Sequence, residues 1–182
     1  YGIQIEGPSY LELGSVKIDG TKQSANDDVG VKLGAGSYGY FHGTTTVNGN
    51  SSNSGGIAAS GGIIWMTGTV NLDSNKQSLV IESGGKMGLW NSTTTISNST
   101  DYGIKAYFGQ LWNYGTMTIS DSSDGNWAVL IDRSGAYLSN LTVTGGSGSD
   151  PLIGVYDSIL TLNGATIKNH QGNLINANRS TM

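Results

Sequence analysis

Cysteine is absent from the 182 residues, and charge is scarce, with 9 Lys and Arg against 13 Asp and Glu. Without cysteine the chain can form neither disulfides nor thiolate metal sites. Charge this sparse, with a net value of −4, disfavours a coiled coil and disfavours binding to nucleic-acid phosphates. No stretch approaches the roughly eighteen apolar residues of a membrane-spanning helix. We therefore expect no nucleic-acid partner and no membrane insertion.

Glycine, by contrast, is abundant, with 29 residues, and apolar residues recur at a nearly fixed distance. The pattern is an apolar residue or Thr, then any residue, then a second apolar residue. That second position recurs at Ile18, Val47, Leu72, Ile96, Ile119, Val143 and Ile167. The successive intervals are 29, 25, 24, 23, 24 and 24 residues. A period of this length is the signature of a repeat protein whose units stack along one axis.

Each repeat also begins with a short alternation such as Ile3-Gln4-Ile5 or Leu79-Val80-Ile81, bounded by Gly, Ser, Asn or Asp. Such alternation predicts a strand with one buried face. A middle strand and a closing strand follow, so each rung of about 24 residues holds three short strands. The predicted fold class is all-β, a parallel β-helix of seven rungs and a partial eighth. It forms one domain over residues 1–182, with longer loops at 21–28 and 48–55.

The tripeptide Leu-Trp-Asn occurs twice, at residues 89–91 and 111–113, and we superpose the two copies in neighbouring rungs. Counting back from Ile119 by the same number of residues as in the other rungs would instead place Asn113 on the outer side and Trp112 in the core. Stacked strands lie about 4.8 Å apart, so outward residues of successive middle strands form a column, and its apolar part is roughly 20 Å long. With the copies superposed, that column is Glu12, Phe41, Met66, Trp90, Trp112, Tyr137 and Thr161.

An exposed apolar strip of this kind marks an interaction site, and Trp and Tyr rings suit both sugars and protein partners. Three interpretations remain open: contact with a glycan or host surface, contact between the subunits of a trimer, and cover by the chain's own loops. The predicted ligand-binding residues are Phe41, Met66, Trp90, Trp112 and Tyr137.

Carboxylates near the first turn of several rungs are a secondary candidate site, formed by Glu82, Asp132 and Asp157. Separations of one rung, about 5 Å, or two rungs, near 10 Å, would approach the carboxylate spacings of glycosidases. Counting from the opening strands, however, aligns Asp157 with Arg133, which favours solvated turn carboxylates. His42 falls on an inward position, so we interpret it as a core residue. No cofactor or metal site is predicted.

The rung length, the Gly-x-apolar openers and the Thr-x-Ile-Ser closers resemble the right-handed parallel β-helix superfamily, the pectin-lyase-like fold, over essentially the whole chain. Lyases of that superfamily use a basic residue and a calcium-binding acidic cluster. This sequence has only Arg133 and Arg179, and no three carboxylates converge in adjacent columns. Its regular pattern, rich in Ser, Thr, Asn and Gly, is instead similar to bacterial surface adhesins and phage tailspikes.

The expected function is a non-catalytic adhesion module of a secreted surface protein that binds a polysaccharide, a glycoprotein or a host-cell surface. The expected location is extracellular, at the cell surface or cell wall. A second hypothesis is a trimeric phage tail fibre or tailspike segment on the virion surface, and a third is a polysaccharide lyase or glycosidase. Because the chain starts at Tyr1 and its last rung breaks off after Ala177, we also expect a piece of a longer protein.

Overall fold

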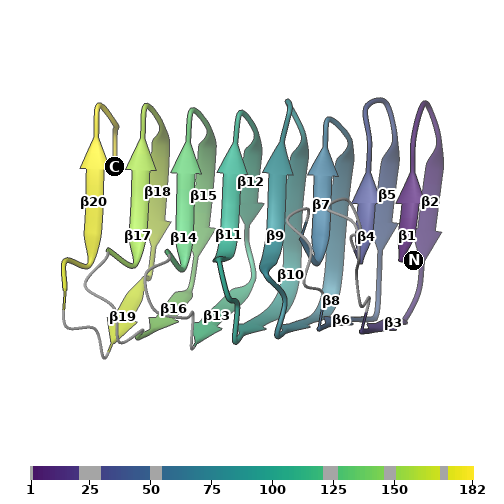
Figure 1. Cartoon of the computed structure of the whole chain (residues 1–182), viewed down its shortest axis with the longest axis horizontal. Helices are drawn as coiled ribbons and strands as arrows, with labels where there is room; N and C mark the ends of the chain where they lie inside the picture. The colour runs from purple at the N-terminus through teal and green to yellow at the C-terminus, as the bar shows by residue number, and fades with distance from the viewer. Residues whose placement is uncertain (1, 21–29, 50–54, 121–126, 146–150, 169–171) are drawn as a thin grey trace.

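The structure, a computed structural model, shows a stack of short strands whose first and last rungs lie at opposite ends (Figure 1). All strand pairs are parallel, so the predicted all-β parallel solenoid with rungs of about 24 residues is confirmed. None of the described residues lies in a helix long and apolar enough to cross a membrane. The described residues are 2–20, 30–49, 55–120, 127–145, 151–168 and 172–182.

The first sheet contains the opening strand of every rung, and its eight strands follow one another in chain order. Its inward column joins the predicted opening residues from Ile3 to Ile175, so the alternation of these segments was interpreted correctly. The strands are β1 (Ile3–Ile5), β4 (Val31–Leu33), β7 (Ile57–Ser60), β9 (Gln77–Glu82), β11 (Tyr102–Tyr107), β14 (Val129–Asp132), β17 (Ile153–Tyr156) and β20 (Ile175–Asn178).

The second sheet has twelve strands and consists of a middle set and a third set. Two long strands, β8 (Ile63–Asp73) and β10 (Lys86–Ser97), pair with strands of both sets. The other middle strands are β2 (Tyr10–Leu13), β5 (Tyr38–Phe41), β12 (Gln110–Asn113), β15 (Gly135–Ser139) and β18 (Ile159–Asn163). The other third strands are β3 (Val16–Asp19), β6 (Thr44–Asn48), β13 (Thr116–Ser120), β16 (Leu141–Thr144) and β19 (Thr166–Lys168).

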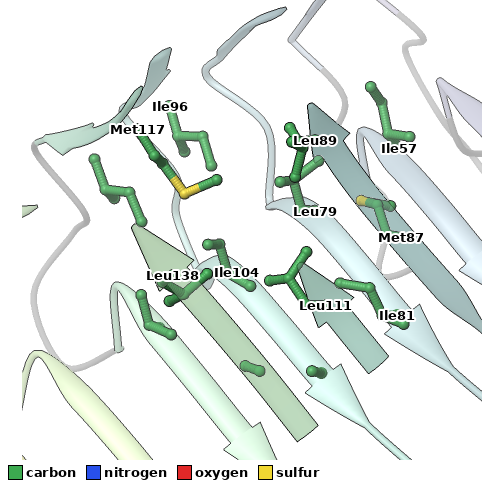
Figure 2. Packing of buried hydrophobic residues seen from close by; sticks show 14 of the residues in the cluster. Ile57, Leu79, Ile81, Met87, Leu89, Ile96, Ile104, Leu111, Met117 and Leu138 are labelled. Atoms are coloured by element: carbon green, nitrogen blue, oxygen red, sulfur yellow. The ribbon is translucent and has the colours of Figure 1, made fainter. Parts of the chain in front are cut away.

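The core is one continuous column of apolar side chains along the stack. Inward residues of all three sets meet there, as Figure 2 shows for Ile81 of the first sheet, Leu111 of the middle set and Met117 of the third set. These side chains have no exposed surface. Burying each one contributes about 1.5–3 kcal/mol, and no single rung could bury its own apolar face alone.

The closing residues that define the period also share one column, from Ile18 through Ile96 to Ile167. This confirms the repeat length that the sequence predicts. Of the two predicted loops, residues 21–28 lie outside the described part of the chain, as do residues 50–54 of the loop at 48–55.

The corner between the middle and third sets varies in length from rung to rung. Two residues separate the inward Leu13 from the inward Val16, whereas four separate Leu89 from Thr94. The sequence prediction counted back from the third strand with a fixed offset. That offset is valid only where the corner has a constant length.

Phe41 and Met66 are therefore misplaced in the prediction. Both face the core and are 0% exposed. Their rungs have one more corner residue than the first rung, so the count ends one position too late. The outward residues of these two strands are Tyr40 and Trp65, which pair with each other in register.

The superposition of the two Leu-Trp-Asn copies is also wrong, because the register pairs Trp112 with Gly88 and Asn113 with Leu89. Trp112 still lies on the outer side, since Asn113 is the inward, fully buried residue. The amide of Asn113 donates a hydrogen bond to the backbone carbonyl of Ser139 at 2.8 Å. The longer corner of β10, which has a register irregularity between residues 89 and 92, accounts for one residue of this two-residue offset.

Candidate functional site

The outer side of the middle set carries a group of aromatic side chains on five consecutive rungs, most of them stacked on one another. Most of them belong to one outward column, and the others stand at the corner that follows it. We call this group the aromatic face. It consists of Tyr40, Trp65, Trp90, Trp112, Tyr114 and Tyr137.

Gly88 lets the rings of Trp65 and Trp112 meet across an intervening rung. The two residues lie two strand spacings apart, about 9.6 Å, yet their ring centroids are 6.0 Å apart with an interplanar angle of 18°. A Cβ atom at Gly88 would stand 1.9 Å from Cζ3 of Trp65, so the indole occupies the space above the glycine. The missing side chain thus keeps the aromatic face continuous.

A second stack runs along the corner. The ring centroids of Trp90 and Tyr114 are 4.3 Å apart, and those of Tyr114 and Tyr137 are 4.9 Å apart. Asn91, in the bulge after Trp90, has a φ of 49°, which Asn tolerates better than most residues. Trp90 and Tyr114 remain 43% and 42% exposed. The stack therefore orients the rings while leaving nearly half of each of these two side chains open to solvent.

A hollow of about 340 Å³ opens on the aromatic face. Its rim includes the hydroxyl groups of Tyr40 and Thr67, which are 3.5 Å apart. This volume is at the lower end of the range for small-ligand sites. Ring walls combined with a few hydroxyl groups suit a ligand that has flat apolar faces and polar edges. The lining residues are Tyr38, Tyr40, Trp65, Thr67 and Trp90.

Of the residues predicted to bind a ligand, the structure brings three together on the outer surface: Trp90, Trp112 and Tyr137. Phe41 and Met66 lie beneath that surface, in the core. The prediction missed Tyr40, Trp65 and Tyr114. Alternation within each strand could have identified the first two. Tyr40 lies between the inward Gly39 and Phe41, and Trp65 lies between the inward Ile64 and Met66.

His42 is a further correction, because it lies outside the core and its side chain is 47% exposed. It follows the buried Phe41 directly in the alternating strand. Its Nε2 atom is 3.4 Å from Oε1 of Glu12, and its ring packs against Tyr40 with a centroid distance of 5.5 Å. His42 thus borders the aromatic face at its N-terminal side.

Two of the predicted acidic residues form ion pairs at the turn between the first sheet and the middle set. Oδ1 of Asp132 is 3.1 Å from Nε of Arg133, and Oδ2 of Asp157 is 2.6 Å from Nη2 of Arg179. The hydrogen bond that Arg133 donates to the Asp132 carboxylate, together with the negative charge of Asp132, raises the pKa of Arg133 above its already high ordinary value. Arg133 therefore stays charged at every accessible pH.

Glu82, the third predicted carboxylate, shares an outward column with Asp132, and Tyr107 stands between them. The two carboxylates are two rungs apart, about 10 Å at the strand spacing. Oε1 of Glu82 accepts a hydrogen bond from the Ser60 hydroxyl at 3.0 Å. Asp157 lies in the next column, level with Arg133, as the count from the opening strands predicts.

No group of three or more His, Asp or Glu side chains suited to a metal ion occurs in the described part of the chain. The site is thus characterised by its stacked rings and by the charged turn beside them. Comparisons with protein-family models, with curated proteins and with solved structures find no match for this chain.

Proposed function

We propose that the chain is a non-catalytic recognition module that binds glycans through the aromatic face. The observation that carries this proposal is the set of five stacked rings on consecutive rungs, Trp65, Trp90, Trp112, Tyr114 and Tyr137, with Trp90 and Tyr114 almost half exposed. Polysaccharides or glycoproteins of a cell or host surface are the corresponding partners, and an extracellular location follows from that role.

The physical basis is the match between aromatic rings and pyranose rings. A pyranose presents apolar C–H groups on its faces and hydroxyl groups at its edges, and an aromatic ring with a polar Tyr or Trp group complements both. The stacked rings are already held by their neighbours. Binding therefore immobilises few additional side chains, which limits the entropic cost of association.

The test compares two tryptophans that each stack on another aromatic ring, Trp112 on Trp65 of the middle set and Trp127 on Tyr156 of the first sheet. Replacing Trp112 with Ala should weaken binding to a responsive glycan by about 2 kcal/mol, or roughly thirtyfold. The matched control is Trp127→Ala, because Trp127 stacks on Tyr156 of the first sheet at 5.2 Å, away from the aromatic face. Both variants are titrated against glycans selected on an array with the unmodified chain.

Unchanged binding by Trp112→Ala would exclude the aromatic face as the glycan site. Sedimentation tests the remaining interpretation, in which the aromatic face is a contact between the subunits of a trimer. A stable trimer that Trp112→Ala dissociates would assign the face to subunit contact and overturn the glycan proposal. A monomer that loses glycan affinity through Trp112→Ala but not through Trp127→Ala supports it.

A further inference from the structure

A second recess lies at the turns that connect the first sheet to the middle set. Figure 1 shows these turns along its top, between β11 and β12, β14 and β15, and β17 and β18. It spans the C-terminal rungs and encloses about 630 Å³. We call it the turn groove. This volume lies within the range of small-ligand sites.

The turn groove concentrates positive charge in an acidic chain. Three cations line it, Lys86, Arg133 and Arg179, and these include both arginines of the sequence. Asp157 is the one carboxylate among its lining residues in the described part of the chain. It pairs with Arg179, and Asp132, beside the groove, pairs with Arg133. No described carboxylate forms an ion pair with Lys86. With Asp157 and Asp132 counted against the three cations, the groove has a net charge of +1, in contrast to −4 for the whole chain.

The backbone of these turns is unusual at the residues that line the groove. In the first three rungs, a glycine takes the positive φ at this turn (Gly7, Gly36 and Gly61). In the following rungs a residue with a side chain takes it: Ser83, Phe108, Arg133, Asp157 and Arg179. A positive φ is costly for bulky side chains. The strained positions thus coincide with the rungs on which charged and aromatic side chains line the groove.

Gly135 leaves the floor of the groove open. It lies in an outward column between Gln110 and Ile159. Its φ is not positive, and a Cβ atom at this position would meet no atom within 4 Å. Neither backbone conformation nor packing therefore requires glycine here. The missing side chain provides the empty space between the neighbouring side chains of the column.

The turn groove adjoins the aromatic face on the same strands. Lys86, Gln110 and Gly135 stand two residues before Gly88, Trp112 and Tyr137, and alternation directs both sets of residues outward. Two residues along a strand span about 6.7 Å. A saccharide chain lying on the aromatic face can therefore place a neighbouring sugar in the groove.

We propose that the turn groove binds the anionic group of an acidic glycan whose neighbouring sugars stack on the aromatic face. The guanidinium groups of Arg133 and Arg179 match the geometry of a carboxylate or sulfate group, and Lys86 adds a point charge. This inference rests on the proposed function and names its ligand class. Uronate and sulfated sugars share the required chemistry, and the test separates them.

The experiment measures affinity by calorimetry for the full chain and three probes: a short oligohexuronate, a sulfated oligosaccharide of the same length, and a neutral one. At least one acidic probe should bind about tenfold more tightly than the neutral probe, the effect expected of a charge-assisted hydrogen bond. Arg179→Gln and Lys86→Gln should remove this preference and leave the neutral probe unaffected. The matched control is Lys168→Gln, which removes an exposed charge from the third set.

Gly135→Leu is the second variant, because a Cβ atom at this position meets no atom within 4 Å and the larger side chain would occupy the groove. This variant should lower the affinity for the acidic probe at least as much as Arg179→Gln does. Equal affinity of the unmodified chain for acidic and neutral probes would overturn the inference, as would an equal effect of Lys168→Gln. Trp112→Ala distinguishes the two proposals. If the aromatic face does not bind glycans, this variant should bind all three probes with the affinity of the unmodified chain.

Discussion

The outer faces of the middle and third sets lie on the same twelve-stranded sheet, yet they carry different side chains. The middle set presents the aromatic face. The third set presents two outward columns of threonine, which we call the threonine face. One column contains Thr44, Thr69, Thr93 and Thr116, and the other contains Thr46, Asn71, Thr95, Thr118, Thr142 and Thr166.

Comparison of the two faces shows which side-chain columns depend on the strand preference of single residues and which depend on neighbours in adjacent rungs. Threonine is β-branched and suits an exposed strand position in any rung, so the same residue type can repeat along a column. The aromatic face needs Gly88 beneath Trp65 and a long corner at Trp90. Aromatic stacking therefore depends on particular neighbours in adjacent rungs, whereas the threonine columns repeat from rung to rung.

The largest effect is expected where the aromatic face meets the core. Phe41→Ala should lower the free energy of unfolding by about 3–5 kcal/mol, because it removes a fully buried ring. Tyr40→Ala, one residue away on the outer side, should lower it by about 1 kcal/mol or less. Denaturant unfolding followed by circular dichroism measures both. Losses of similar size would contradict the register on which the aromatic face is built.

A smaller effect is expected from the glycine that the aromatic face requires. Gly88→Ala should destabilise the chain by about 1–3 kcal/mol, because its methyl group collides with Trp65. Gly135→Ala is the matched control, with an expected change within about 0.5 kcal/mol. Equal stability of the two variants in thermal unfolding would show that Trp65 does not depend on Gly88.

The smallest effect concerns Asp73, which borders the threonine face. Hydrogen bonds from the Ser97 hydroxyl and the Asn98 amide lower the pKa of Asp73 below its ordinary value of 3.8. A lowered folded-state pKa stabilises the fold above the unfolded value and loses that contribution as pH falls through the folded value. The contribution should stay below about 1 kcal/mol, because Asp73 is partly exposed to solvent and solvent screens its interactions.

The measurement for Asp73 is the midpoint of thermal unfolding of the unmodified chain and of Asp73→Asn, taken from pH 6 downward. Asp73→Asn should be less stable at pH 6, and the difference should shrink as the pH falls below about 4. A difference that stays constant with pH would show that Asp73 acts through packing and not through its charge.

Much of the fold was predictable because two of the three strands in each rung are marked by local alternation. The opening residues from Ile3 to Ile175 and the closing residues from Ile18 to Ile167 all lie in the predicted columns. The candidate site was predicted only in part. Trp90, Trp112 and Tyr137 are on the surface, but Phe41 and Met66 are in the core, because the middle strand follows a corner whose length changes.

The amino-acid sequence by itself determined the period and the stacking, through the recurrence of apolar residues about every 24 positions. It also determined the inward columns of the first and third strands, because these depend on alternation within a few residues. Only the tertiary structure decided which rings meet. Trp65 reaches Trp112 because Gly88, from the rung between them, has no side chain. The turn groove likewise depends on Arg133, Arg179 and Lys86 coming from three different rungs, and only stacking brings such residues together.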